Sequence, residues 1–522
     1  SGGDVRPWES TIGRDDAGRE VERFATGGIR ITTDYNDMGL VRSRHVRSGN
    51  RHTGWRSYRW DVGARLMSMR SNLSPEPVIF DYDSMCNLVR GDYSMYESVF
   101  RTPDKVGNLY REDGCKGREY DRGGRLLWDG EYHYRYDCEG NLVHKSRRDV
   151  SVPENGHTEK KGWLGMLFSA DDADNKDNSL ETDPFAGWQQ GDTCYKWQAN
   201  GMLAGVRTPD GRTVTFGYDA LGRRISKRTG NTVHRFGWDG NVVLHEWDTD
   251  EARRPRLVTD ETGREEYDGT EKPDNLVTWV YDGTSFTPVA KVTDGERYTI
   301  VHDYLGTPTQ AYDSKGELVW EMLLDVYGRV AECHGNRTLV PFRYQGQYED
   351  EDTGLYYNRF RYYDPNAGSY LSQDPIKLKG GGRLYGYVRD LNISIDLFGL
   401  DREHIIFLSD GGGVIPPQTM STTNPHGIFT VDATGSYYDD RKALANVAGI
   451  DDPGKNWRAH HIDYDPKTNT MRMQFVHQDY HSYSHVGGAD DFYKNTGFKY
   501  GSDEAVAEAA KRNEAKIKAS CS

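Results

Sequence analysis

Short Tyr-Asp units recur along most of the first 400 residues, and they limit the possible folds more than any other feature. Each unit reads Tyr-Asp, two variable residues, Gly or Asn, a basic or polar residue and an apolar one. Clear copies are EYDRGGRLLWDG (119–130), RYDCEGNLVHKS (135–146) and GYDALGRRISKR (217–228); looser copies are DYDSMCNLVRGDY (81–93), WDGNVVLHEWD (238–248) and YDSKGELVWE (312–321). Asp holds turns by accepting backbone hydrogen bonds, and Gly adopts positive φ at no steric cost. The pattern therefore predicts many short strands joined by Asp-x-x-Gly turns.

The composition agrees with a mainly β chain. The 522 residues include 58 Gly and 34 Tyr, and 12% are aromatic, which is typical of short strands joined by tight turns. A prior of about 150 residues per domain indicates several units. Without an apolar run of about 18 residues, no membrane span is expected. The segment 151–190 lacks the repeat and is rich in Asp and Asn, so we expect an inserted loop there.

The chain ends and the cysteines give weaker indications. The start, SGGDVRPWES, has no secretory signal pattern, and we expect the natural N-terminus to be missing. The six cysteines are scattered without a CxxC pair, so we expect reduced thiols rather than a disulfide framework or a metal knuckle.

The stretch 302–400 resembles the core-terminating signature of the Rhs family. It reads HDYLGTPTQAYDSKGELVWEMLLDVYGRVAE, then PFRYQGQYEDEDTGLYYNRFRYYDPNAGSYLSQDPIKLKGGGRLYGYVRD and ISIDLFGL. The resemblance implies a hollow β-shell, or cocoon, over residues 1–373 and an autoproteolysis segment over 374–400. It also implies that the shell encloses a variable C-terminal toxin.

Two aspartates in this signature resemble the family's self-cleaving pair. Asp374 and Asp396 lie 22 residues apart, and the family cuts after the Leu of a DPxGL motif, which here implies the Leu400–Asp401 bond. Two neighbouring carboxyl groups cannot both ionise cheaply, so one keeps a proton and acts as the acid while the other activates water. On spacing alone, each aspartate could instead only hold a local turn.

This chain departs from the family pattern at two positions. Leu397 replaces the usual Pro, and Arg383 replaces the usual Asn of GGxNLY. Neither change removes a carboxylate, but both are expected to alter the local turn and the rate of cutting.

After Leu400 the composition changes. The Gly- and Pro-rich stretch 401–439 is expected to be a linker or plug, and residues 440–522 a small α+β domain. The segment DEAVAEAAKRNEAKIKA predicts a helix over 503–518, with Ser502 and Asp503 as candidate caps.

The segment 456–488, NWRAHHIDYDPKTNTMRMQFVHQDYHSYSHVGG, is rich in histidine. His481 and His485 would share one face of a helix, and DPKTN would turn a hairpin after His460 and His461. This resembles the ββα-metal nucleases of the HNH/endonuclease VII group with an Ala-His-His motif. The resemblance implies that His460, His481 and His485 hold one divalent ion (Mg²⁺, Zn²⁺ or similar). It also implies that His461 is the general base, since imidazole accepts protons near neutral pH.

Other polar residues of this segment have less defined roles. Gln474, or its rival Asn469, would match the family's middle Asn, while Asp463 and Asp465 are expected in turns. His477 is expected at the surface. An isolated HxxxH pair is usually incidental, so the adjacent His-His and the Gly-Gly ending are what favour the nuclease interpretation.

Charge is an objection to a nuclease. The net charge is −15, and residues 401–522 contain 13 Lys and Arg against 17 Asp and Glu. Because non-specific DNA affinity comes mainly from basic contacts to phosphates, a local basic face is required.

The sequence predicts a secreted effector of interbacterial competition. It would leave by a contact-dependent route such as type VI secretion and degrade DNA in the target-cell cytoplasm. Expected partners are an immunity protein and, through the missing N-terminal region, a secretion spike and chaperone; a homodimer is possible. The alternatives are an RNase with the same site and a non-catalytic adhesion protein with a Tyr-Asp shell.

Overall fold

The computed structural model describes residues 7–93, 98–150, 185, 187–259, 261–283, 285–377, 382–400, 404–406, 414–415, 429–448, 452, 454–455, 457–477 and 488–520. The predicted inserted loop 151–190 falls almost wholly outside these ranges. No helix among the described residues is both long and apolar enough to cross a membrane. The described cysteines, Cys86, Cys115, Cys138, Cys194 and Cys333, are free thiols, while Cys521 lies outside the described residues.

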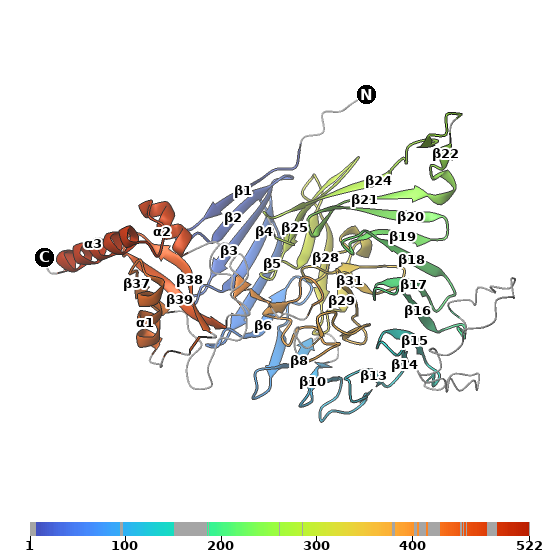
Figure 1. Ribbon diagram of the computed structural model, residues 1–522, viewed down its shortest axis with the longest axis horizontal. Helices are drawn as coiled ribbons and strands as arrows, with labels where there is room; N and C mark the ends of the chain where they lie inside the picture. The colour runs from blue at the N-terminus through green and yellow to red at the C-terminus, as the bar shows by residue number, and fades with distance from the viewer. Residues whose placement is uncertain are drawn as a thin grey trace.

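Two large antiparallel meanders contain most of the described strands (Figure 1). The first sheet has nine strands in chain order: β1 (Ser10–Arg14), β2 (Glu20–Ala25), β3 (Ile29–Tyr35), β4 (Val41–Ser48), β5 (Arg51–Trp60), β6 (Leu66–Ser71), β7 (Val78–Tyr82), β8 (Leu88–Tyr93) and β9 (Val99–Phe100). A short hairpin, β10 (Thr102–Pro103) and β11 (Leu109–Tyr110), follows it.

The second sheet has 16 strands and also follows chain order. Its strands are β12 (Glu119–Tyr120), β13 (Leu126–Trp128), β14 (His133–Tyr136), β15 (Leu142–Ser146), β16 (Thr193–Trp197), β17 (Leu203–Arg207), β18 (Thr213–Tyr218), β19 (Arg224–Thr229), β20 (Thr232–Asp239), β21 (Val242–Asp250), β24 (Asp274–Tyr281), β25 (Pro288–Thr293), β26 (Arg297–His302), β27 (Pro308–Tyr312), β28 (Leu318–Leu324) and β29 (Val330–His334). A 3₁₀ turn, η2 (Glu251–Arg253), and the hairpin of β22 (Leu257–Thr259) and β23 (Glu265–Tyr267) project between β21 and β24. The expected mainly β shell architecture is confirmed.

The repeat forms the predicted turn. At Asp219 the carboxylate Oδ1 accepts the backbone N–H groups of Leu221 at 3.0 Å and Arg223 at 2.8 Å. Gly222 has φ of 73° and donates its N–H to the Asp219 carbonyl. The Asp thus satisfies the turn's backbone donors, and the Gly supplies the positive φ that the turn needs. The same arrangement recurs at Asp121 and Asp325, and in the Asp61 turn Ala64 adopts the positive φ in place of a glycine.

The tyrosine of the repeat ties neighbouring units together. Tyr218 donates its hydroxyl to the Leu203 carbonyl at 2.7 Å, and Tyr82 donates to Leu66 at 3.0 Å. Each ring is therefore partly buried while its hydroxyl keeps a hydrogen-bond partner, which explains why the repeat uses Tyr rather than Phe.

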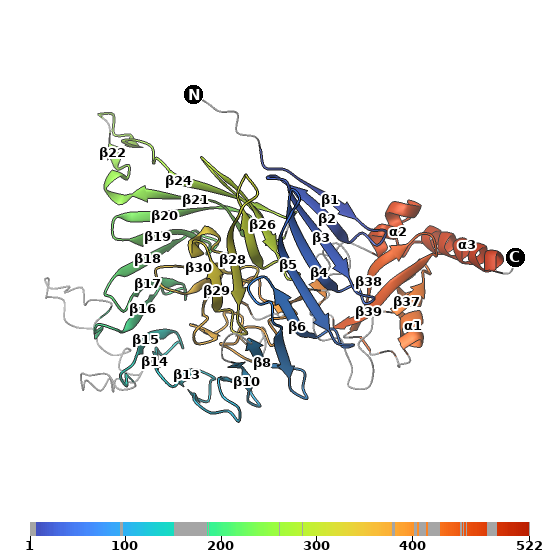
Figure 2. The same ribbon diagram turned by 180° about the vertical axis from the view of Figure 1, so that it is seen from behind.

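The two sheets pack against each other through apolar clusters, the larger of which lies between β4–β8 and the region of β27 and β28. Residues of β4–β8, such as Leu66 and Leu88, contact Leu305, Leu323 and Tyr327 near β27 and β28. Figure 2 shows the two sheets side by side at β5 and β26.

The segment 337–395 lies against the inner surface of both sheets. It contains η3 (Arg337–Leu339), β30 (Tyr348–Glu349), β31 (Tyr356–Asn358), β32 (Arg361–Asp364), β33 (Ser369–Tyr370) and β34 (Ser394–Ile395). Its tyrosines form a buried cluster: Tyr344, Tyr356, Tyr363, Tyr370 and Tyr387. Other side chains of the segment, including Leu355 and Leu371, join the apolar cluster of β13–β18.

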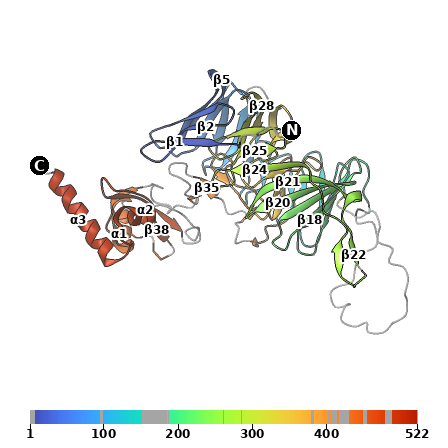
Figure 3. The same cartoon turned by 90° about the horizontal axis from the view of Figure 1, so that it is seen from above.

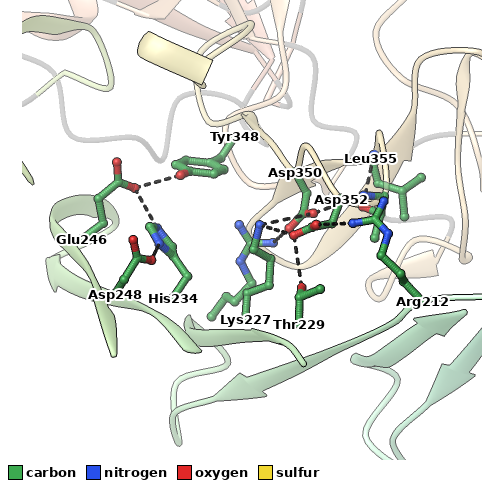
Figure 4. A network of polar contacts seen from close by, with 12 residues as sticks. Arg212, Lys227, Thr229, His234, Glu246, Asp248, Tyr348, Asp350, Asp352 and Leu355 are labelled. Carbon is green, nitrogen blue, oxygen red and sulfur yellow. Dashed lines mark hydrogen bonds and ion pairs between the residues drawn. The ribbon is translucent and has the colours of Figure 1, made fainter. Parts of the chain in front are cut away.

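Ion pairs attach this segment to the second sheet (Figure 4). Asp350 is fully buried and lies 3.1 Å from Nη1 of Arg224, which is equally buried. Asp352 lies 2.8 Å from Lys227 and 3.0 Å from Arg212.

A second part of the same network involves a histidine. Tyr348 donates to Glu246 at 2.8 Å, and His234 lies between Glu246 and Asp248. Burial opposes a charge on His234, but the hydrogen bonds and charges of the two carboxylates outweigh it and raise its pKa to about 8.

A separate α+β unit follows. Its sheet has the order β37 (Phe429–Asp432), β39 (Thr470–His477), β38 (Trp457–Asp465), so β38 is an edge strand. Its helices are α1 (Tyr437–Ala448), α2 (Ala489–Thr496) and α3 (Asp503–Ser520). The helix predicted over 503–518 is confirmed as α3, and Ser502 accepts the Ala505 N–H at its start. Because β37 belongs to this sheet, the unit begins before residue 440.

The expected enclosure of the C-terminal unit is not what the structure shows. Figures 1, 2 and 3 show this unit outside the two large sheets, on the side of the first sheet. Residues 337–395 pack against the large sheets, with their tyrosines in a buried cluster.

Candidate functional sites

Asp374 and Asp396 converge on one guanidinium. Both side chains are almost fully buried, with 1% and 2% of their surface exposed. Nη2 of Arg361 lies 3.2 Å from Oδ2 of Asp374 and 3.5 Å from Oδ2 of Asp396. The structure therefore brings the two predicted aspartates together around a shared cation.

Asp396 also holds the residue before the predicted scissile bond. Its Oδ1 accepts the Leu400 N–H at 3.0 Å and the Phe398 N–H at 3.3 Å. Its Oδ2 accepts the Tyr370 hydroxyl at 2.8 Å. Burial, together with the Asp396 charge, raises the pKa of Tyr370 well above its ordinary value, so Tyr370 remains a hydrogen-bond donor.

The structure bears on two expectations about these aspartates: how their like charges are relieved, and whether they hold local turns. The like charges of the aspartates were expected to be relieved by a shared proton, whereas the structure places the positive charge of Arg361 beside both. The turn-forming role is also present, because Asp374 accepts the Ile376 N–H at 2.8 Å. The same carboxylates therefore hold local turns and lie at the predicted cleavage point.

The two departures from the family pattern lie in close packing. A Cβ added to Gly346 would lie 2.3 Å from the Leu397 carbonyl oxygen, so backbone meets backbone there. The Arg383 side chain packs on the Gly107 turn, where an added Cβ would lie 2.4 Å from Arg383 Cδ. Both substituted residues are thus part of the packed segment around the aspartates.

Strands pair on either side of the predicted scissile bond. β34 precedes Leu400, and β35 (His404–Ile406) follows it. Ser394 pairs with Ile405 and Ile395 with His404, and β35 then pairs with β36 (Val414–Ile415). The bond therefore lies in the connection between two hydrogen-bonded strands.

In the C-terminal unit, His461 is held by a buried carboxylate that the sequence interpretation did not include. Nε2 of His461 lies 2.8 Å from Oδ2 of Asp440, and their side chains are 6% and 0% exposed. Asp440 also accepts the Thr434 N–H at 3.0 Å and hydroxyl at 2.6 Å, as well as the Tyr500 hydroxyl. Since the carboxylate accepts, Nε2 carries the hydrogen and Nδ1 keeps a lone pair.

Two aromatic rings complete the surroundings of His461. Tyr437 and Tyr500 each contact its ring edge-on, with centroids 5.3 Å away. Tyr437 is 52% exposed, so the buried imidazole lies just beneath an aromatic surface residue.

His460 lies on the opposite face of β38. The pairing places His461 across from Met473 and His460 across from Gln474. Met473 belongs to the apolar core, so His460 points to the other face of the sheet, where it is 7% exposed. By alternation, Arg458 and Arg472 share this face, which gives it positive charge.

The remaining predicted ligands, His481 and His485, lie outside the described residues, and those described contain no cluster of three or more His, Cys, Asp or Glu side chains able to hold a metal. The nearest described residues before and after these two histidines, His477 and Gly488, both lie next to β38. His477 pairs with Trp457, and a Cβ added to Gly488 would lie 2.4 Å from the Cβ of His461.

Asn469 and Asp465 have structural contacts. Asn469 accepts the Tyr464 hydroxyl at 2.8 Å and donates to Asn513 of α3. Asp465 accepts the Lys467 N–H at 2.9 Å in the hairpin turn. These contacts let Asn469 fix the hairpin, one of the two roles expected of the family's middle Asn, while the side chain of its rival Gln474 lies outside the described residues.

Asp440, Tyr500 and Arg361 are the functional candidates that the sequence interpretation missed. Asp440 and Tyr500 are 21 and 60 residues from their partners in this site, so no local spacing indicates them. Arg361 lies within the Rhs-like signature, in the stretch RFRYYD, but no local pattern indicates that its side chain lies beside two carboxylates.

Comparisons with known proteins agree with this architecture. Residues 185–380 match the family model described as Teneurin YD-shell. The chain is 27% identical over 404 residues to "Probable deoxyribonuclease RhsB" of Dickeya dadantii (strain 3937), covering 75% of this chain and 24% of that relative. It is 39% identical over 346 residues to "Toxin protein Tse5" of Pseudomonas aeruginosa, covering 63% and 24%. It is 28% identical over 422 residues to "Double-stranded DNA deaminase toxin A" of Burkholderia cenocepacia (strain H111), covering 74% and 25%.

A solved structure, "Crystal Structure of TcdB2-TccC3", matches with a TM-score of 0.46 and 18% identity over 75% of this chain and 20% of that one. The chain spans about a quarter of the length of the curated relatives named above. The printed activities of these curated relatives differ, so they do not assign an activity to the C-terminal unit.

The repeated Asp turns, the two meandering sheets and the family match define a YD-shell protein. More particularly, the chain is similar in sequence to Rhs proteins and to a YD-repeat toxin.

Proposed function

We propose that this chain is the shell and toxin portion of an effector of bacterial competition, with a C-terminal endonuclease that cuts DNA. The observation that carries the nuclease proposal is the buried hydrogen bond between His461 and Asp440. A buried carboxylate that orients an imidazole in this way is typical of a general base. The names of relatives as a deoxyribonuclease and a toxin support the same class.

In the proposed reaction, Nδ1 of His461 accepts a proton from the water that attacks a phosphodiester. Asp440 keeps Nε2 protonated and stabilises the imidazolium that forms, as a buried carboxylate does in hydrolytic triads. Arg458 and Arg472, on the His460 face, supply charge for phosphates despite the acidic balance of the unit.

A divalent ion is part of this proposal. His460 fits a ligand role in its residue type and burial, on the face away from the apolar core, and His481 and His485 would complete the set. Such an ion would supply positive charge next to the phosphate. Because His460 and His461 lie on opposite faces, a single centre has to form around the open edge of β38, which no further strand covers among the described residues.

We also propose that the chain cuts itself between Leu400 and Asp401. Water adds to the Leu400 carbonyl carbon as the C–N bond breaks. One of Asp374 and Asp396 takes a proton from water, and the other gives one to the leaving nitrogen. The hydrogen bond from the Leu400 N–H to Asp396 supports this assignment, because it brings a carboxylate to the residue that is cut.

The nuclease is tested with the full chain, a divalent ion, plasmid DNA and RNA. His461→Ala should slow cleavage about a hundredfold or more, the usual contribution of a general base. His334→Ala is the matched control, because His334 is an exposed histidine of the shell paired only with Glu332. Wild-type protein that cuts neither polymer would refute the proposal, and cleavage of RNA alone would change the substrate to RNA.

Self-cleavage is tested on a denaturing gel. The wild-type chain should give two bands, and Asp374→Asn or Asp396→Asn should leave one. Normal cutting in both variants would remove the assignment.

The proposal extends to how the protein is delivered. We propose that the protein is a secreted effector, that an immunity protein protects the producer from it, and that a spike and chaperone of a type VI or similar machine deliver it. It would act in the cytoplasm of the target cell. We also propose that it forms a homodimer, which light scattering tests through the molar mass in solution.

A further inference from the structure

We infer that Tyr437 is a stacking platform for an unpaired base, and that the C-terminal unit therefore binds single-stranded DNA in preference to duplex DNA. This inference rests on the proposed nuclease and deepens it by naming the form of its substrate. Tyr437 is the first residue of α1, and it is 52% exposed although its ring contacts the buried His461.

Three neighbours hold the Tyr437 ring against its own unit. Its centroid lies 5.3 Å from those of His461 and Tyr500, with interplanar angles of 84° and 70°. Gly501 lies against the same ring, because a Cβ added there would be 3.1 Å from Cε2 of Tyr437. A ring that is already packed and still half exposed loses little conformational freedom when it binds, which suits it to stacking.

The position of this ring beside the proposed base determines what it can bind. A base stacked on the exposed part of Tyr437 would bring its own phosphate next to His461, since the two side chains are in contact. In a duplex both faces of each base are covered by its neighbours, so a base reaches a tyrosine only after it leaves the stack, at a cost in free energy. This cost is smallest for a strand that is already unpaired. The arrangement therefore favours single-stranded DNA.

A second exposed ring and a lysine adjoin Tyr437. Tyr438 is 65% exposed, and Nζ of Lys442, on the next turn of α1, lies 4.2 Å from the centroid of the Tyr438 ring. The ring offers a surface for a neighbouring base, and the ammonium group offers a positive charge to the phosphate between the two bases. Asp439 is exposed on the same turn and offsets this charge, so the two rings are expected to supply most of the affinity.

Stacking also explains how an acidic unit could bind DNA. Residues 401–522 contain 13 Lys and Arg against 17 Asp and Glu, which disfavours a binding surface made of phosphate contacts alone. Base–aromatic stacking adds affinity without positive charge, and it tolerates any sequence because every base has a flat face.

The test measures binding separately from cutting. The full chain is titrated, with a chelator present, into a fluorescent single-stranded DNA oligonucleotide and into the same sequence as a duplex, and anisotropy gives each Kd. The single strand should bind more tightly than the duplex. Tyr437→Ala should weaken single-strand binding about tenfold, the usual effect of removing one stacked ring, and should leave duplex binding nearly unchanged. Equal affinity of the wild-type chain for the two forms would overturn the inference.

The matched control is Tyr493→Ala. Tyr493 lies on α2 of the same unit and is 54% exposed, close to the exposure of Tyr437, and its replacement should leave single-strand binding at the wild-type level. Tyr437→Phe keeps the flat ring and should also bind like wild type, which excludes a role of the hydroxyl. Where Tyr437→Ala lowers Tm, Tyr437→Leu fills the space against Gly501 without an aromatic face and should still bind weakly. A loss in Tyr493→Ala equal to that in Tyr437→Ala, or full binding by Tyr437→Leu, would overturn the inference.

The proposed nuclease and this inference fail in different ways. With a divalent ion in place of the chelator, a wild-type chain that cuts no nucleic acid of either form refutes the nuclease. A wild-type chain that cuts DNA, beside a Tyr437→Ala chain that binds single strands as tightly, overturns only the stacking role. The exposed rings would then be assigned to contact with a protein partner.

Discussion

The buried ion pair between Arg224 and Asp350 should be a major source of stability for the inner segment. The side chains are 1% and 0% exposed, and the contact is 3.1 Å long. Asp350→Asn removes the negative charge and leaves a guanidinium buried without it. Breaking such a pair costs about 3–5 kcal/mol. The rings of Phe236 and Tyr357, each 4.6 Å from the guanidinium carbon, continue to offset part of that charge, so we expect about 3 kcal/mol.

The neighbouring carboxylate provides the comparison. Asp352→Asn should cost only about 1 kcal/mol, because Lys227 still has Asp350 within 3.7 Å and Arg212 is half exposed to water. Replacing both members of the buried pair, as Arg224→Met with Asp350→Leu, should be closer to wild type than Asp350→Asn alone.

Thermal unfolding, followed by tryptophan fluorescence, measures these effects. A loss of about 3 kcal/mol should lower Tm by about 3 °C, because the unfolding of a chain of this size has an entropy of about 1 kcal/mol/K. If Asp350→Asn lowers Tm no more than Asp352→Asn does, the reasoning from burial is refuted.

Three further results are expected. The pKa of His234 is raised from 6.5 to about 8, so its protonated form should stabilise the fold fully below pH 6.5, the pKa in the unfolded chain. This stabilisation, about 2 kcal/mol, should be lost as pH rises through 8. Unfolding of the His234→Gln variant, measured across the same pH range, should not show this loss. Gly399→Ala should slow self-cleavage on a time-resolved gel, since Gly399 has φ of 66° and an added Cβ would lie 2.5 Å from the Asn358 carbonyl oxygen; an unchanged rate would contradict the tight packing there. Gly488→Ala should lower the rate of DNA cleavage with little change in DNA binding, because the added methyl group displaces His461. A wild-type cleavage rate in this variant would contradict the assignment of His461 as the base.

Local features of the shell were predictable from the sequence because they depend on neighbouring residues. The Asp-x-x-Gly turns form as expected since the Asp, the Gly and the bonded amides lie within five positions of one another, as at Asp219. The α3 helix was also predictable, because its Ala, Glu and Lys residues favour helix along its whole length.

Contacts between distant parts of the chain could not be predicted in this way. Asp440 reaches His461 only because α1 packs beside β38, and Arg361 reaches both aspartates only because β32 lies beneath the 396–400 turn. The position of the C-terminal unit outside the two large sheets likewise depends on contacts between distant segments that no local pattern indicates.

The pairing of β34 with β35 changes what hydrolysis at Leu400 would accomplish. Ser394 and Ile395 are joined to Ile405 and His404 by a backbone ladder that does not include the Leu400–Asp401 peptide. A cut chain would therefore remain docked through these hydrogen bonds, as a two-piece assembly. Departure of the toxin would then require a mechanical or thermal peeling of β35, a step whose timing is independent of the proteolysis.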